Sequence, residues 1–176
     1  MRYIFDSREK KNDHIKAYFD KHGIEYIVQK LDVGDYQIEG LPNRVVDRKA
    51  NLEEVATNLM TRNDSARFWR EVRKAHDEGI QLIVLVENGG QVHDINDVVK
   101  WRSKYSRATG RRLIDEMIRV ERAYHVLWQF CDKRSTARRI AELLTEGGVT
   151  DGNKQETVQE TATDNKKPTK PSQETG

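Results

Sequence analysis

The sequence has few of the features that would narrow its class at once. It holds a single cysteine, Cys131, among 176 residues, which excludes an internal disulfide and a zinc site built from cysteines. A lone thiol fits a reducing compartment, and we expect a cytoplasmic protein. No apolar run approaches the roughly 20 residues of a membrane-spanning helix, so no membrane partner is expected. No G-x-x-x-x-G-K-[ST] loop is present, which argues against a nucleotide hydrolase.

The C-terminal segment 147–176 differs in composition from the rest of the chain. Its only larger apolar residues are Val149 and Val158, and it holds two of the three prolines. Such a segment buries too little surface to offset its ordering entropy, so we expect a folded domain at 1–146 and a disordered polar tail at 147–176. The tail carries a net charge of −1, and the total of +2 therefore leaves the domain at +3. A mildly basic domain is compatible with nucleic acid.

Strand and helix patterns alternate along the domain. The first strand pattern begins at Tyr3, so we expect no signal peptide. The apolar run Ile80–Val86 indicates a strand covered on both faces. Together the patterns predict an α/β domain with a mixed sheet flanked by helices on both faces. The expected strands are 3–6, 24–31, 36–38, 45–49, 80–86 and 125–130, and the expected helices are 10–22, 51–60, 65–79, 98–104, 111–123 and 135–147.

Acidic residues fall at the ends of the predicted strands. Asp6 closes the first, Asp35 follows a glycine before the third, and Asp47 and Lys49 lie two apart on the fourth. Alternation places Asp47 and Lys49 on one face of that strand and Arg48 on the other. Carboxylates beside a lysine suit a site that holds Mg²⁺ for phosphodiester hydrolysis. Taken singly, each residue also has an ordinary explanation as a turn residue, a cap or a surface ion pair.

The order of these motifs resembles the XPF-type nuclease domain, a member of the restriction-endonuclease-like superfamily with its PD-(D/E)XK motif. The family pattern is a D-x-R-E segment, a G-D turn, an E-R-K triplet and an acid four residues after its lysine. Here Asp47 stands where the family usually has glutamate, and Glu53 where it usually has aspartate. The resemblance covers residues 3–145. Its motifs are Asp6-Ser7-Arg8-Glu9, Val33-Gly34-Asp35-Tyr36 and Val46-Asp47-Arg48-Lys49, followed by Glu53.

The resemblance implies a metal-dependent DNA endonuclease that cuts branched DNA or junctions between double and single strands. It implies Mg²⁺ as the cofactor, with Mn²⁺ able to substitute. Asp35 and Asp47 would be the principal metal ligands, with Asp6 as a further ligand, and Lys49 would be the catalytic lysine. The implied catalytic set is Asp6, Asp35, Asp47, Arg48, Lys49 and Glu53. Glu53 on its own is also explained as a first-turn helix acid.

A catalytically inactive, nuclease-like subunit that serves as a DNA-binding partner is the alternative reading. The presence of Asp35, Asp47 and Lys49 argues against it. Larger relatives of this type often end in a helix-hairpin-helix domain, and nothing after Gly147 predicts one. We therefore expect substrate choice to come from this domain, from a homodimer or from a partner protein. A compact version of this kind would suit phage or bacterial repair or recombination.

A basic stretch at 100–112 contains no acid and includes Trp101 and Tyr105. Basic side chains match phosphates, and aromatic rings can stack on unpaired bases. The alternative is a solvated helix face, with Trp101 as an apolar anchor beside Val98 and Val99. The residues expected to contact DNA are Arg8, Arg62, Arg67, Lys100, Arg102, Lys104, Arg107, Arg111 and Arg112.

Overall fold

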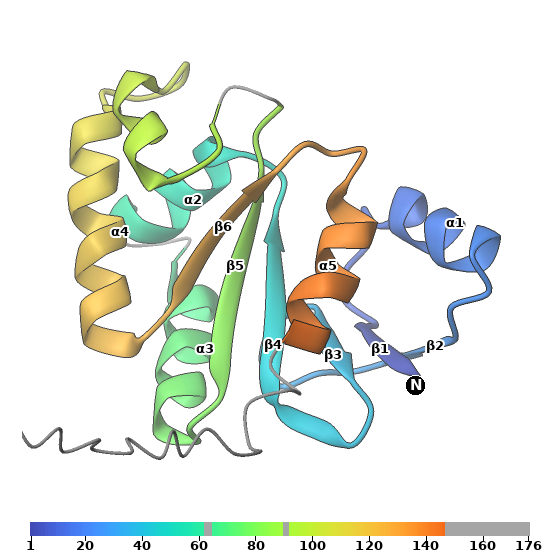
Figure 1. The fold of residues 1–176 in the computed structure, drawn as a ribbon. Helices are drawn as coiled ribbons and strands as arrows, with labels where there is room; N and C mark the ends of the chain where they lie inside the picture. Colours follow the sequence, from blue (N-terminus) through green and yellow to red (C-terminus); the bar gives the residue numbers. More distant parts are fainter. Residues whose placement is uncertain (62–64, 90–91, 147–176) are drawn as a thin grey trace, which may run out of the picture.

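A six-stranded mixed sheet forms the centre of the protein in a computed structural model that describes residues 1–61, 65–89 and 92–146 (Figure 1). The strand order is β2-β1-β3-β4-β5-β6. β3 runs antiparallel to β1 and β4, whereas β1 and β2 are parallel, as are β4, β5 and β6. The strands are β1 Tyr3–Asp6, β2 Tyr26–Gln29, β3 Tyr36–Ile38, β4 Leu41–Lys49, β5 Gln81–Glu87 and β6 Leu127–Cys131.

Helices cover both faces of the sheet, as the sequence predicts. One face packs against α1 (Asp13–Lys21) and α5 (Thr136–Thr145). The other packs against α2 (Leu52–Met60), α3 (Ala66–Asp77), α4 (Gly110–Tyr124) and the 3₁₀ helix η1 (Ile95–Lys100). No helix in the described part of the chain is long and apolar enough to cross a membrane.

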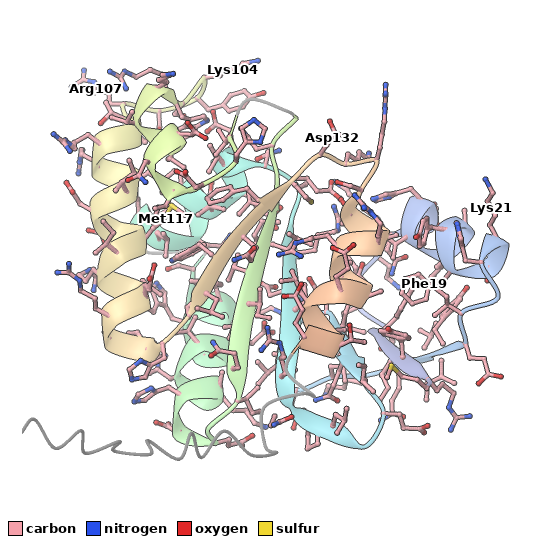
Figure 2. The ribbon with its side chains drawn as sticks, in the orientation of Figure 1. Phe19, Lys21, Lys104, Arg107, Met117 and Asp132 are labelled. Atoms are coloured by element: carbon pink, nitrogen blue, oxygen red, sulfur yellow. The ribbon has the colours of Figure 1, made fainter. Side chains whose placement is uncertain are left out.

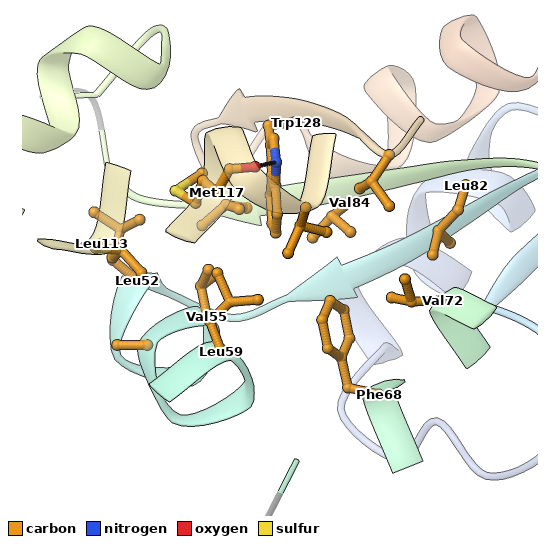
Figure 3. Packing of buried hydrophobic residues seen from close by; sticks show 14 of the residues in the cluster. Leu52, Val55, Leu59, Phe68, Val72, Leu82, Val84, Leu113, Met117 and Trp128 are labelled. Atoms are coloured by element: carbon orange, nitrogen blue, oxygen red, sulfur yellow. Dashed lines mark hydrogen bonds between the residues drawn. The ribbon is translucent and has the colours of Figure 1, made fainter. Parts of the chain in front are cut away.

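The two hydrophobic clusters meet at β5, the strand predicted from its continuous apolar run. Its side chains alternate: Val84 and Val86 point into one cluster, and Ile83 and Leu85 into the other. In the first cluster the Trp128 indole N–H donates to the Met117 carbonyl at 3.0 Å, which satisfies the one polar atom of the ring (Figure 3). The sheet is therefore a rigid support for the residues at the ends of its strands.

The bounds of several predicted elements differ from the structure. β4 begins at Leu41 rather than at residue 45, and β2 is shorter than expected and lies at the sheet edge, where Val28 is 54% exposed. The helix predicted at 98–104 is wrong beyond residue 100, where a loop follows η1. The start of α4 lies directly against η1, because a Cβ at Gly110 would lie 1.9 Å from the Val98 carbonyl oxygen. Position 62 and the segment 147–176 lie outside the described residues, so the expectations for Arg62 and for the tail stay predictions.

Candidate active site

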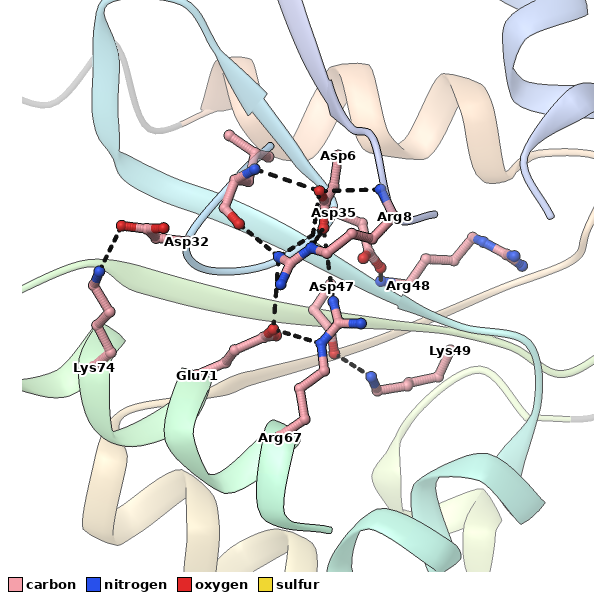
Figure 4. Close-up of polar contacts among 11 residues, drawn as sticks. Asp6, Arg8, Asp32, Asp35, Asp47, Arg48, Lys49, Arg67, Glu71 and Lys74 are labelled. Carbon is pink, nitrogen blue, oxygen red and sulfur yellow. Dashed lines mark hydrogen bonds and ion pairs between the residues drawn. The ribbon is translucent and has the colours of Figure 1, made fainter. Parts of the chain in front are cut away.

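The predicted alternation along β4 is confirmed. Asp47 and Lys49 share one face of the strand, and their side chains are only 6% and 10% exposed (Figure 4). Lys49 Nζ lies 2.7 Å from Asp47 Oδ2 and 5.3 Å from the centre of the Phe68 ring. Asp47 Oδ2 is buried, and it is the oxygen that forms this ion pair. A carboxylate has about four acceptor sites, so the ion pair with Lys49 does not use all of them.

The turn before β3 places Asp35 against the same strand. Gly34 has a φ of +68°, and a Cβ at this position would lie 3.1 Å from the Val46 carbonyl oxygen. Only glycine combines that backbone conformation with such a close approach. The Asp35 amide donates to the Val46 carbonyl at 2.8 Å, and Asp35 Oδ2 accepts from the Arg48 amide at 2.8 Å. The glycine in the Val33-Gly34-Asp35-Tyr36 motif thus fixes a buried carboxyl next to Asp47.

The electrostatic balance at this position is short of positive charge. Burial raises the pKa of Asp35 well above its usual range, and the negative charge of Asp47 raises it further, while Lys49 opposes both. Burial lowers the pKa of Lys49, but Asp47 and Asp35 outweigh that effect, so the net pKa is raised. Lys49 accordingly stays protonated at neutral pH. Two buried carboxyls share one ammonium, an arrangement that a second cation would stabilise.

These side chains line a cavity of about 180 Å³ at the end of β4. Glu54 and Asn58 also line it, and they were not predicted to do so. They lie four residues apart and so share one face of α2, which was the available sequence signal. The lining residues are Arg8, Glu9, Asp35, Asp47, Arg48, Lys49, Glu54, Asn58, Arg67, Phe68 and Glu71.

Asp6 lies near this cavity but is engaged elsewhere. Its buried carboxylate accepts from Arg8 Nε at 2.8 Å and from the Leu31 amide at 3.4 Å, and Arg67 lies 3.6 Å away. No group of three histidine, cysteine, aspartate or glutamate side chains suited to a metal ion occurs among the described residues. In this arrangement Asp6 holds Arg8 in place, and its predicted role as a metal ligand stays a prediction.

The structure does not bring Glu53 into the cavity. Its carboxylate accepts from the Ser103 hydroxyl at 2.8 Å and from the Lys104 amide at 2.7 Å, both in the loop after η1. The neighbouring Glu54 faces the cavity and accepts from the Ala50 amide at 2.8 Å. Successive residues on a helix point about 100° apart, so the acid predicted to approach the site is displaced by the one after it.

Arg48 points to the opposite side of the sheet, as predicted, and forms ion pairs there. Its guanidinium lies 3.0 Å from Glu87 and 3.2 Å from Glu9, and its side chain is 5% exposed. Glu87 also accepts from the Thr136 hydroxyl at 2.8 Å and lies 3.1 Å from His14 Nε2. Arg48 therefore ties β4 to β5 and to the segment before α1.

Family comparison agrees with this geometry. The ERCC4 domain family matches residues 5–143. The chain belongs to the ERCC4-domain family. No curated protein matches the chain.

Two solved structures share the ERCC4 domain's fold. XPF from Aeropyrum pernix has a TM-score of 0.63 and 19% identity, over 85% of this chain and 66% of that one. XPF from Aeropyrum pernix in complex with DNA has a TM-score of 0.62 and 20% identity, over 84% and 64%. The chain thus spans about two thirds of the length of these structures. The likeness confirms the predicted α/β restriction-endonuclease-like fold.

The side chain of Trp101 packs against the hydrophobic core, which favours the anchor role over stacking.

The basic residues expected to contact DNA fall into two groups. In the first, Arg8 and Arg67 line the cavity and pair with Asp6 and Glu71, and their side chains are 35% and 50% exposed. The exposed basic residues around the loop between η1 and α4 are Lys100, Arg102, Lys104, Arg107, Arg111 and Arg112.

Proposed function

We propose that this ERCC4 domain is a metal-dependent DNA endonuclease that prefers branched DNA or junctions between double and single strands. The observation that carries the proposal is the buried pair Asp35 and Asp47 with Lys49 in one cavity. Membership of the ERCC4-domain family supports it. Burying two acids that share one lysine costs folding free energy. An endonuclease recovers this free energy when it binds a cation. A subunit that only binds DNA would not need such a pair.

The donor set fits Mg²⁺, for which Mn²⁺ would substitute. Mg²⁺ is commonly held by one or two carboxylates, with waters and substrate phosphates completing its shell. Asp35 and Asp47 supply those carboxylates, and both line the cavity. When bound, the cation supplies a Lewis acid for phosphodiester hydrolysis.

The residues of the chain have separate tasks in this scheme. Asp35 and Asp47 hold the cation, and Lys49 keeps its proton and faces the charge that builds on the scissile phosphate. Arg67, half exposed at the cavity, lies where a neighbouring phosphate would be held. Substrate choice comes from the exposed basic surface, with a homodimer or a partner protein as further sources of specificity.

Cleavage assays on the full chain test the proposal. Flaps, forks, four-way junctions and plain duplex are incubated with Mg²⁺, with Mn²⁺ and with excess EDTA. Asp47→Asn and Lys49→Ala should each lower turnover by at least about a hundredfold, the scale of a lost transition-state contact. Lys21→Ala, an exposed lysine on α1, is the matched control and should cleave as the wild type does.

Circular dichroism establishes that each variant is folded before rates are compared. Full cleavage in excess EDTA would exclude the metal-dependent scheme, and near wild-type rates for Asp47→Asn or Lys49→Ala would exclude the site. A wild-type chain that binds junctions but cleaves none of them with either metal would identify it as the inactive DNA-binding subunit instead.

A further inference from the structure

The loop 101–109 between η1 and α4 presents an aromatic side chain to solvent. Tyr105 is 86% exposed, more than any other large hydrophobic residue in the described part of the chain. Folding buries almost none of this ring, so the core does not explain its presence. An open ring face suits a planar partner such as an unpaired base, because base stacking needs no particular sequence.

The loop is held in place by contacts within it. Arg102 pairs with Thr109 as an isolated antiparallel bridge, and the Ser103 amide donates to the Ala108 carbonyl at 3.1 Å. The Ser103 hydroxyl oxygen accepts from the Tyr105 amide at 3.1 Å and from the Ser106 amide at 2.9 Å. A loop that is already ordered loses little entropy when it binds, so its exposed ring is available at low cost.

Glu53 fastens the loop to the first turn of α2. Its two carboxylate oxygens accept from the Ser103 hydroxyl and the Lys104 amide. The next residue, Glu54, lines the cavity that holds Asp35 and Asp47. Neighbouring residues on one helix turn therefore connect the loop with the candidate active site. The loop therefore lies beside the turn of α2 that lines the candidate active site.

The loop and the start of α4 carry a concentration of positive charge. Lys104 and Arg107 are exposed and project from the same end of the molecule (Figure 2). Arg111 and Arg112 lie in the first turn of α4, where the helix dipole is positive and disfavours cations. Such a placement opposes stability in the free protein. A polyanionic strand would relieve this repulsion.

A cavity of about 320 Å³ lies between the loop and α2. Tyr105, Arg107 and Arg112 are on its walls, together with Glu53 and Met60 from α2. Its volume falls at the lower end of the roughly 300–1,000 Å³ of small-ligand pockets, which corresponds to a ligand no larger than a nucleotide. Duplex DNA keeps its bases stacked, so an unpaired strand is the form that can use this cavity and the Tyr105 ring.

We propose that the loop 101–109 binds the single-stranded arm of a DNA junction, with Tyr105 stacked on an unpaired base and Lys104 and Arg107 on its phosphates. Glu53 is a positioning residue that holds the loop at the edge of the active site. The inference rests on the proposed function in taking DNA as the ligand. The inference assigns to this loop the recognition of a junction over plain duplex.

Binding of the full chain to a fluorescent fork and to a duplex of equal length, both in EDTA to prevent cleavage, tests the inference. Tyr105→Ala should weaken fork binding by at least about fivefold and duplex binding by less than about twofold. Tyr105→Phe keeps the ring and should bind as the wild type does. Lys104→Ala should weaken binding and flatten its salt dependence by about one unit of slope, while Lys21→Ala on the far side should not.

Equal losses on fork and duplex for Tyr105→Ala, or no loss on either, would overturn the inference, as would a wild-type chain that binds the fork no more tightly than the duplex. Parallel cleavage assays with Mg²⁺ separate it from the proposed function. Absence of cleavage with Tyr105-dependent fork binding would refute only the endonuclease, and cleavage with Tyr105-independent fork binding would refute only the inference.

Glu53→Ala separates the positioning role from a role at the metal. If Glu53 is a positioning residue, Glu53→Ala should raise the KM for forks by several-fold and leave kcat at saturating DNA nearly unchanged. If Glu53 instead acts at the metal, Glu53→Ala should lower kcat on fork and duplex alike, and that outcome would overturn its assignment as a positioning residue.

Discussion

Removal of the Arg48 side chain should destabilise the fold strongly. Arg48 and Glu87 are 5% and 4% exposed, and the guanidinium lies between Glu87 and Glu9 at 3.0 and 3.2 Å. Arg48→Met would leave Glu87 buried without its main counter-charge. Breaking a buried pair in this way costs about 3–5 kcal/mol. For a chain of this size each kcal/mol lowers Tm by roughly 2–4 °C, so the expected fall is about 6–20 °C.

Thermal and urea unfolding followed by circular dichroism measure this effect. Arg48→Met combined with Glu87→Gln removes both charges and should recover a large part of the loss, because the glutamine can still accept from Thr136. Arg138→Met is the control, since that side chain is 65% exposed and its contact with Glu142 at 3.7 Å is a surface pair worth about 0–1 kcal/mol.

Cleavage by the folded fraction distinguishes a structural Arg48 from a catalytic one. We expect Arg48→Met, assayed well below its Tm, to retain far more activity than the hundredfold-impaired Lys49→Ala. A Tm within about 1 °C of the wild type, together with a hundredfold loss of cleavage, would refute this reasoning. It would show that Arg48 contacts the phosphate and that its pair with Glu87 contributes little.

Two further predictions concern the buried acid Asp35 and the partly buried ring of Trp101. Asp35→Asn should raise Tm at pH 7 in the absence of metal. Burial and the charge of Asp47 raise the pKa of Asp35 in the folded state. The contribution of Asp35 to stability is therefore full below the ordinary aspartate pKa of about 4, and it is lost as pH rises through the higher folded pKa. Tm measured from pH 4 to pH 8 should show the variant's advantage growing with pH, and a constant difference would contradict this. Trp101→Ala should lower stability by less than the roughly 3–5 kcal/mol expected for a fully buried tryptophan, because this ring is only partly buried. The substitution should affect fork and duplex binding alike. An unchanged Tm with a loss confined to forks would make Trp101 a stacking residue.

Local sequence determined the strands that carry the site. The period-two alternation on β4 placed Asp47 and Lys49 together and Arg48 opposite, and the apolar run of β5 predicted a strand buried on both faces. Both inferences depend only on side chains a few residues apart, whose directions follow from strand geometry. The glycine before Asp35 likewise marked a turn that the structure contains. The order of these motifs was enough to predict the ERCC4-type fold.

Only the tertiary structure decided which partner each charged side chain meets. Glu53 and Glu54 both lie in the first turn of α2, and the packing of that helix places one against Ser103 and the other at the cavity. The sequence predicted a helix at 98–104, but η1 ends at Lys100, and the loop that follows leaves Tyr105 in solvent. Such pairings join residues far apart in the sequence, such as Glu53 and Lys104, which are 51 positions apart. Local periodicity holds no information about them, because they depend on how whole elements pack against one another.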